Sequence, residues 1–221
     1  MFKINQFTKT NIHEYFPNNK QELREIIEKL LEEDKNANLN IIDTSNIIEM
    51  TNLFKDLDPH DIDISEWNIS NVYSFENMFY GCKNIRNLNI KNWDVSNVKS
   101  FHGMFCNCTN FCTDLSKWNV SNGMHFSFMF FCCENFNCDL SDWNVSKATI
   151  MMYMFCDCTL FDCDLSKWNI RNVKNFKQMF LRCIKFDSDL ENWPISPIAE
   201  TENMFLDCDS LKKYPSWYKE D

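Results

Sequence analysis

The chain has 221 residues, with 22 Lys and Arg against 32 Asp and Glu, and a formal net charge of −10. This acidic balance argues against a nucleic-acid partner, because phosphate binding needs a basic face and the sequence shows none. No stretch reaches the roughly 18 consecutive apolar residues of a membrane helix, so we expect no membrane insertion.

The N-terminal segment, residues 1–39, lies outside the main sequence pattern. Its first part, MFKINQFTKTNIHEYF, lacks the apolar core of a secretory signal peptide. Residues 18–34 follow, and their apolar side chains have helical spacing between charged ones: Leu23, Ile26, Ile27, Leu30 and Leu31. We predict an amphipathic helix that caps the first repeat, with binding of a partner by this helix as the alternative.

A repeat of about 25 residues occupies residues 40–211. Tryptophan recurs at intervals of 26, then 25 four times, then 24, at positions 67, 93, 118, 143, 168, 193 and 217. A Met-Phe pair recurs with a matching period, from Met78-Phe79 to Met204-Phe205. The unit reads approximately D-L-S-x-W-N-V-S-N-V-x-x-F-x-x-M-F-x-x-C-x-x-F.

Each unit combines two patterns. The first part of the unit, such as DLSKWNV (114–120), suits a short extended segment. The second part has the spacing of a helical stripe, as an earlier unit shows with Val72, Phe75, Met78, Phe79 and Cys82. Serines such as Ser70 and Ser96 precede the stripe and suit a helix N-cap. Stacked units bury the apolar side chains that a single unit would leave exposed. We therefore predict that the tryptophans form one buried column and the phenylalanines another, where a column is the set of residues at one repeat position in successive units. The predicted fold is α/β: a right-handed solenoid of about six to seven 25-residue leucine-rich-repeat-like coils with an N-terminal helical cap.

Twelve cysteines raise the question of metal binding and disulfides. Six share one repeat position and suit packing as small buried apolar residues: Cys82, Cys108, Cys133, Cys158, Cys183 and Cys208. The other spacings are those of the repeat and not of a zinc motif, so we expect no metal. Helices 8–10 Å apart are too distant for disulfides, although tighter turns would weaken this argument. We predict mostly free thiols, which favour a reducing compartment.

Two charged columns have structural explanations. We expect Asp63, Asp114, Asp139, Asp164 and Asp189 to hold chain corners by accepting backbone N–H bonds, in preference to binding calcium. The residues before three successive tryptophans, Lys117, Asp142 and Lys167, alternate in sign. They predict a ladder of ion pairs on a solvated face.

The stretch HFSFMFFCCENF (125–136) is richer in aromatic residues than its repeat position requires. Its ordinary core set is Phe126, Met129, Phe130, Cys133 and Phe136. Phe128 and Phe131 are additional, and the other units have Asn77, Gly103, Tyr153, Gln178 and Asn203 where this unit has Phe128. Clustered exposed aromatic residues often mark contact sites. The candidate partner-binding residues are therefore Met124, Phe128, Phe131 and Tyr153.

The stretch NWDVSNVKSFHGMF (92–105) resembles the roughly 25-residue repeat of BspA-like leucine-rich-repeat surface proteins, which reads W-D-V-S-N-V-T-N-M-x-x-M-F and was first catalogued as a domain of unknown function. The resemblance extends over about residues 40–211. It implies adhesion or host-protein binding and carries no catalytic residues. It also implies a cell-surface or extracellular location. The cytoplasm is the alternative, because no signal peptide is present and the thiols are expected to be reduced.

Residues 212–221 break the repeat with Pro215 and are expected to close it. A repeat places the same residue in every unit, and no Ser-His-Asp, Cys-His or glycine-rich constellation stands out, so we predict neither an enzyme nor a cofactor site. The expected function is non-catalytic binding of a protein partner. The alternatives are a self-assembling structural repeat and, third, a thiol-based metal or redox protein.

Overall fold

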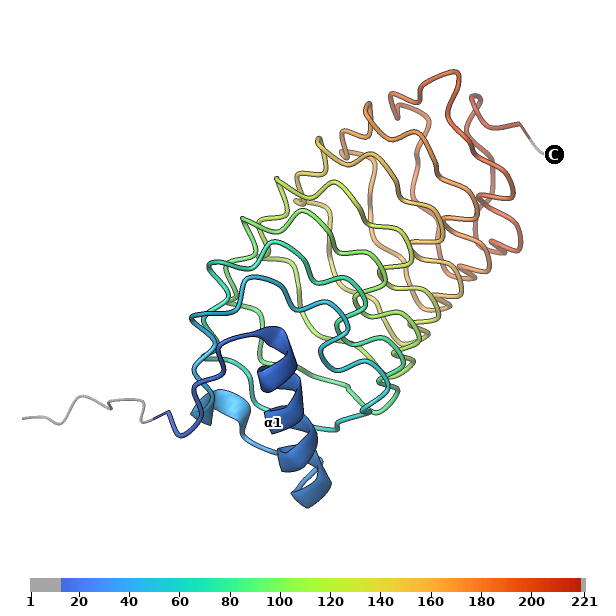
Figure 1. Cartoon of the computed structure of the whole chain (residues 1–221). Coiled ribbons are helices and arrows are strands. Elements are labelled where there is room, and N and C mark those ends of the chain that lie inside the picture. The colour runs from blue at the N-terminus through green and yellow to red at the C-terminus, as the bar shows by residue number, and fades with distance from the viewer. Residues whose placement is uncertain (1–12, 220–221) are drawn as a thin grey trace, which may run out of the picture.

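The computed structural model describes residues 13–219. The chain winds into an elongated stack of short coils, with helix α1 (Lys20–Glu33) at the N-terminal end and the C-terminus at the opposite end (Figure 1). The second helix, the 3-10 turn η1 (Leu39–Ile41), leads into the first coil. No helix in this part of the chain combines the length and the apolar character that a membrane crossing requires.

The predicted α/β fold, a right-handed solenoid of leucine-rich-repeat-like coils with a helical cap, is wrong. Between residues 13 and 219 both helices end before residue 42, so the coils that follow contain no helix. Pairing between coils consists of isolated parallel bridges and not of strands, as in Ser74–Ser100, Ser100–His125 and His125–Ile150. The coils are therefore built from turns.

Backbone hydrogen bonding explains why the Met-Phe segment is not helical. Every second N–H group donates to the next coil: Phe126 to Ile150, Phe128 to Met152, Phe130 to Met154 and Cys132 to Cys156. The intervening N–H groups bond three residues back within the coil: Met129 to Phe126, Phe131 to Phe128 and Cys133 to Phe130. An α-helix would use every N–H group for a bond four residues back. We call residues 126–133 and their equivalents in the other coils the turn ladder.

Two positions of the turn ladder have positive φ in every coil. The first column comprises Asn52, Asn77, Gly103, Phe128, Tyr153, Gln178 and Asn203. The second comprises Asp56, Gly81, Asn107, Cys132, Asp157, Arg182 and Asp207. This left-handed conformation is open to glycine and tolerated by Asn and Asp, and it is incompatible with a continuing helix.

The predicted burial of the aromatic columns is confirmed. The indoles from Trp67 to Trp193 are at most 6% exposed, and the phenylalanines from Phe79 to Phe205 are fully buried. Phe130 stacks on the equivalent rings of both neighbouring coils, with centroid separations of 5.9 Å to Phe105 and 5.6 Å to Phe155. Each indole N–H also donates to a carbonyl of the preceding coil, as Trp118 does to Ile90 at 3.0 Å. Tryptophan is therefore both a core residue and a link between coils.

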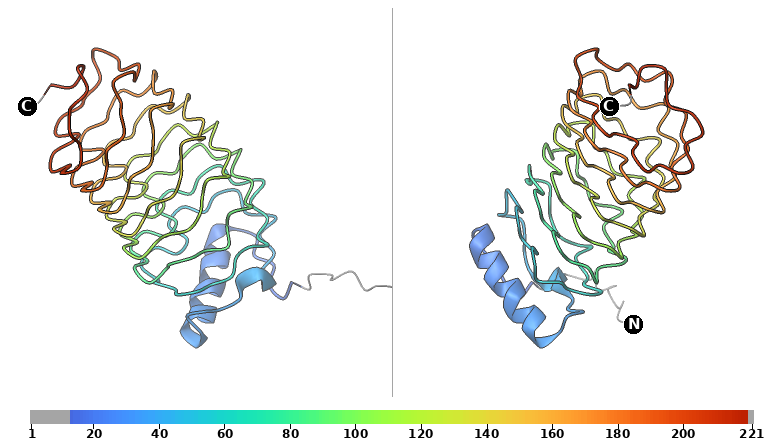
Figure 2. Two further views of the ribbon diagram at one scale, coloured as in Figure 1. Left: turned by 180° about the vertical axis from the view of Figure 1, so that it is seen from behind. Right: turned by 90° about the vertical axis from the view of Figure 1, so that its right-hand side faces the viewer.

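Helix α1 lies against the first coils (Figure 2). Its N-cap Asn19 accepts the N–H of Glu22, and its apolar face buries Leu23, Ile27 and Leu31 in the common core. The Arg24 guanidinium donates to the carbonyls of Asn52, Leu53 and Lys55 at 2.6, 3.2 and 3.2 Å. The Leu53 and Lys55 carbonyls occupy the positions of the first turn ladder that a preceding coil would otherwise serve, whereas the Asn52 carbonyl also accepts the N–H of Lys55 within its own coil.

The polar corners differ in part from the predictions. The expected role of the Asp column is confirmed, since Asp114, for example, accepts the N–H of Ser116 at 3.0 Å. The serines expected to cap helices instead sit in such turns, where the N–H of Ser96 donates to Asp94.

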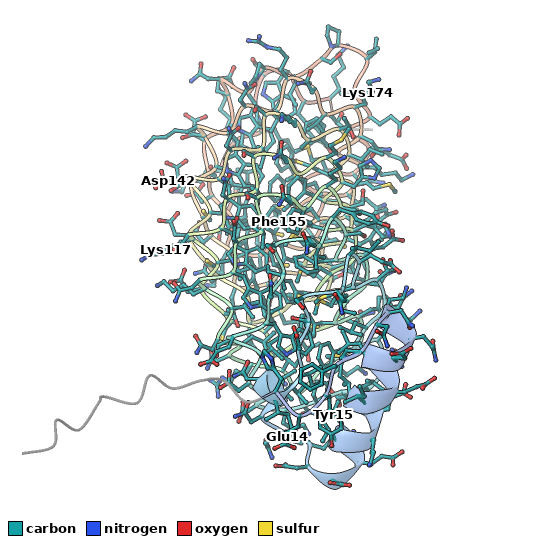
Figure 3. The ribbon with its side chains drawn as sticks, turned by 60° about the vertical axis from the view of Figure 1, so that its left-hand side comes forward. Glu14, Tyr15, Lys117, Asp142, Phe155 and Lys174 are labelled. Atoms are coloured by element: carbon teal, nitrogen blue, oxygen red, sulfur yellow. The ribbon has the colours of Figure 1, made fainter. Side chains whose placement is uncertain are left out.

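The predicted ion-pair ladder is wrong. Within residues 13–219 no ion pair joins Lys117, Asp142 and Lys167. Figure 3 shows Lys117 and Asp142 pointing outward from one edge of the stack, with Lys174 on the opposite edge and Phe155 between them. Water solvates these side chains at little cost, so no pairing is enforced.

Candidate functional site

Four aromatic rings meet on the outer side of the turn ladder. Phe128 stacks on Tyr153, with centroids 4.7 Å apart and an interplanar angle of 14°. Phe131 lies 5.6 Å from Phe128 and 6.2 Å from Tyr153, and His102 meets Phe128 edge-on at 5.7 Å. All four side chains are half-buried. We call His102, Phe128, Phe131 and Tyr153 the aromatic cluster.

The register of the turn ladder places these rings outside the core. Phe126, Met129 and Phe130 point inward and are fully buried. The N–H of Phe128 donates to Met152 at 3.1 Å, which brings the coil of Tyr153 directly alongside. Because equivalent positions of successive coils lie next to each other, Phe128 and Tyr153 stack by virtue of the repeat itself.

Both stacked residues occupy a conformation that bulky side chains seldom adopt. Phe128 and Tyr153 each have φ of 59°. The equivalent positions elsewhere are Asn, Gly or Gln, which this backbone accommodates with less strain. The fold therefore does not require aromatic residues at these two positions.

The structure brings together three of the four predicted site residues. Met124 is 39% exposed and belongs to another set of inter-coil bonds, in which its N–H donates to Lys99 and its carbonyl accepts from Thr149. The sequence reasoning missed His102. The sequence does contain a signal for His102, because its repeat position varies between coils. The equivalent residues are Glu76, Ser127, Met152, Lys177 and Glu202.

A thiol and charge cluster adjoins the aromatic cluster along the chain. Arg182 holds Asp157 through two bonds, of 2.5 Å from Nε and 2.7 Å from Nη2. The sulfurs of Cys132 and Cys156 lie 3.8 and 3.3 Å from Oδ2 of Asp157. Burial and the Asp157 charge raise the pKa of the Cys132 thiol to about 11. Cys132 is thus a weak nucleophile at neutral pH.

The family comparison covers almost the whole stack. The family described as "Mycoplasma protein of unknown function, DUF285" matches residues 21–131 and again residues 113–218. The chain belongs to this family. The two overlapping matches follow from the internal repeat, and the first of them includes most of α1. No curated protein and no solved structure matched the chain.

All twelve cysteines of this DUF285 chain are free thiols in the structure. The shared column does more than fill space, because each thiol donates to the carbonyl of a phenylalanine in the preceding coil, as Cys133 does to Phe105 at 3.0 Å. Burial raises the pKa of Cys133 well above its ordinary value, which keeps the S–H donor in place. Over residues 13–219 no group of three or more His, Cys, Asp or Glu side chains is arranged to hold a metal ion.

Proposed function

We propose that this DUF285 chain is a non-catalytic protein-binding repeat module of the BspA-like type, which acts at the cell surface or outside the cell. The observation that carries the proposal is the stacking of Phe128 on Tyr153 at left-handed backbone positions. The resemblance of NWDVSNVKSFHGMF to BspA-like repeats supports adhesion or host-protein binding as the role. Half-buried aromatic residues commonly dominate the energetics of protein interfaces.

The backbone cost of the two rings is similar in size to the contacts that they make with other rings. A bulky residue held in a sparsely populated backbone region costs about 1–3 kcal/mol. A stacked aromatic pair contributes about 0.5–1.5 kcal/mol beyond its buried area. Phe128 and Tyr153 incur the backbone cost twice, their mutual stacking and their contacts with Phe131 and His102 offset part of it, and both rings stay half-buried. A partner that covers the rings would supply the missing burial.

Self-assembly by stacking of chains is the less favoured function. Arg24 of α1 already occupies acceptors of the first turn ladder, so a second copy could extend the stack there only by displacing α1. The net charge of −10 also repels copies from one another. The aromatic cluster therefore suits a different protein better than a second copy.

A crosslinking experiment can identify the partner and test the site together. A photo-reactive amino acid placed at position 128 should capture a specific protein from a panel of extracellular host proteins. The same group at position 178, in the same column but outside the aromatic cluster, is the matched control.

The captured protein then tests the role of the rings. Phe128→Asn/Tyr153→Asn should weaken its binding by at least about thirtyfold, which is the loss of affinity expected from one hot-spot residue of about 2 kcal/mol. Gln178→Asn should leave the affinity unchanged. Equal capture from positions 128 and 178, or equal affinity of the double variant, would contradict the proposal. Crosslinking of the chain to itself would favour self-assembly instead.

A further inference from the structure

The turn-built coils bring certain cysteines closer together than helices would allow. The N–H of Cys132 donates to the carbonyl of Cys156 at 2.9 Å, so the two residues lie on adjacent rungs of the ladder. Adjacent rungs of this kind are about 4.8 Å apart, whereas packed helices are about 8–10 Å apart. A disulfide needs Cα atoms about 4.4–6.8 Å apart, so the backbone spacing here permits one.

The sulfur atoms of Cys132 and Cys156 both lie close to the Asp157 carboxylate. Both lie within 3.8 Å of Oδ2 of Asp157 and are therefore no more than about 7 Å from each other. Cys132 is half-buried and therefore partly accessible, while Cys156 is 1% exposed. An accessible thiol beside a sheltered one is the arrangement in which the first is oxidised and the second resolves it.

We propose that Cys132 and Cys156 form a dithiol modification site, at which a two-electron oxidant of the peroxide class closes a disulfide between adjacent coils. The Cys132 thiolate attacks hydrogen peroxide and becomes a sulfenic acid, and the departing hydroxide takes up a proton to give water. The Cys156 sulfur then attacks the Cys132 sulfur, and the sulfenic hydroxyl leaves as a second water. The two thiols lose two electrons and two protons, and one peroxide gives two waters.

Other thiols are less suited to this reaction. Cys133 and Cys158 are fully buried and donate to backbone carbonyls. Cys138 and Cys163 accept backbone N–H bonds with their sulfurs at 3.1 Å. Cys132 makes no such backbone bond through its sulfur within the described chain, and the one hydrogen bond of its sulfur there is with Asp157.

Asp157 should slow the reaction, in addition to the larger effect of burial. Its charge adds to burial in raising the pKa of Cys132, so the thiolate is scarce at neutral pH. Loss of this charge should therefore accelerate oxidation. The disulfide would tie together the coil of Phe128 and the coil of Tyr153, immediately next to Phe131, and would fix the geometry of the aromatic cluster.

Peroxide treatment of the folded, full-length chain tests this site. Digestion under non-reducing conditions and mass spectrometry should show a Cys132–Cys156 peptide pair that has lost two hydrogen atoms. Asp157→Asn should form the pair at least several-fold faster than the wild type. Cys112→Ser removes an exposed thiol elsewhere and should leave the pair intact.

Three outcomes would overturn the proposal. The first is a pairing of Cys132 with Cys106 in place of Cys156. The second is dominance of a Cys138–Cys163 pair. The third is the absence of any linked peptide in both the wild type and Asp157→Asn. Cys132→Ser provides an independent check, because it should abolish the linked pair and leave Cys156 available for alkylation after unfolding.

Discussion

Asp139 and Asp164 show what a single polar residue contributes to a coil. Their carboxylates accept the backbone N–H groups of Ser141 and Ser166 at 3.0 and 2.9 Å. These bonds lower the pKa of both carboxyl groups from the ordinary value. Folding therefore favours the charged form, which links the stability of the corners to pH.

We expect the free energy of unfolding to fall as the pH drops below about 4. The folded-state pKa values lie below the unfolded ones, so this stabilisation is complete above the unfolded pKa of about 3.9 and is lost as the pH falls through the folded values. Urea midpoints at about pH 7, 5 and 3 measure the effect. Asp139→Asn/Asp164→Asn is the control, because Asn144 accepts the equivalent bond from Ser146 without titrating. An undiminished acid effect in that variant would show that other groups cause it.

At the scale of the element, the apolar pattern could not separate a turn ladder from a helix. Phe126, Met129, Phe130 and Cys133 would share one face of a helix just as they share the inner side of the turns. The distinguishing signal lay between them, in two columns rich in Asn, Asp and Gly, which favour left-handed backbone. The helix prediction failed because inter-coil pairing of alternate N–H groups outweighs local spacing.

Substitution of Arg24 tests whether helix α1 stabilises the first turn ladder. Arg24→Ala should reduce the free energy of unfolding by about 1.5–3 kcal/mol, because the carbonyls of Leu53 and Lys55 lose a charged donor. Arg24→Lys keeps the charge but lacks the forked guanidinium, so its free energy of unfolding should lie between those of the wild type and Arg24→Ala. Urea unfolding monitored by circular dichroism measures both variants. A loss below about 0.5 kcal/mol in the alanine variant would mean that water serves these carbonyls equally well.

At the scale of the molecule, the period of the repeat made the buried columns predictable, since only inward positions need stay apolar in every coil. The same comparison between coils singled out Met124, Phe128, Phe131 and Tyr153 as departures from variable columns, and all but Met124 belong to the aromatic cluster. It could not find His102 or the contacts among Cys132, Asp157 and Arg182. These contacts join residues from different columns in neighbouring coils. The period of the repeat does not specify which columns come into contact.

The central claim is that Phe128 and Tyr153 are additions to a fold that does not need them. Urea unfolding of Phe128→Asn/Tyr153→Asn tests it most directly, because asparagine suits the left-handed backbone and already occupies this column at Asn77 and Asn203. We predict a free energy of unfolding within about 2 kcal/mol of the wild-type value, because the relieved backbone cost and the lost ring contacts are of similar size. Phe130→Ala, a core control, should lose about 3–5 kcal/mol. A loss of more than about 2 kcal/mol in the double variant would contradict the claim and place both rings in the core.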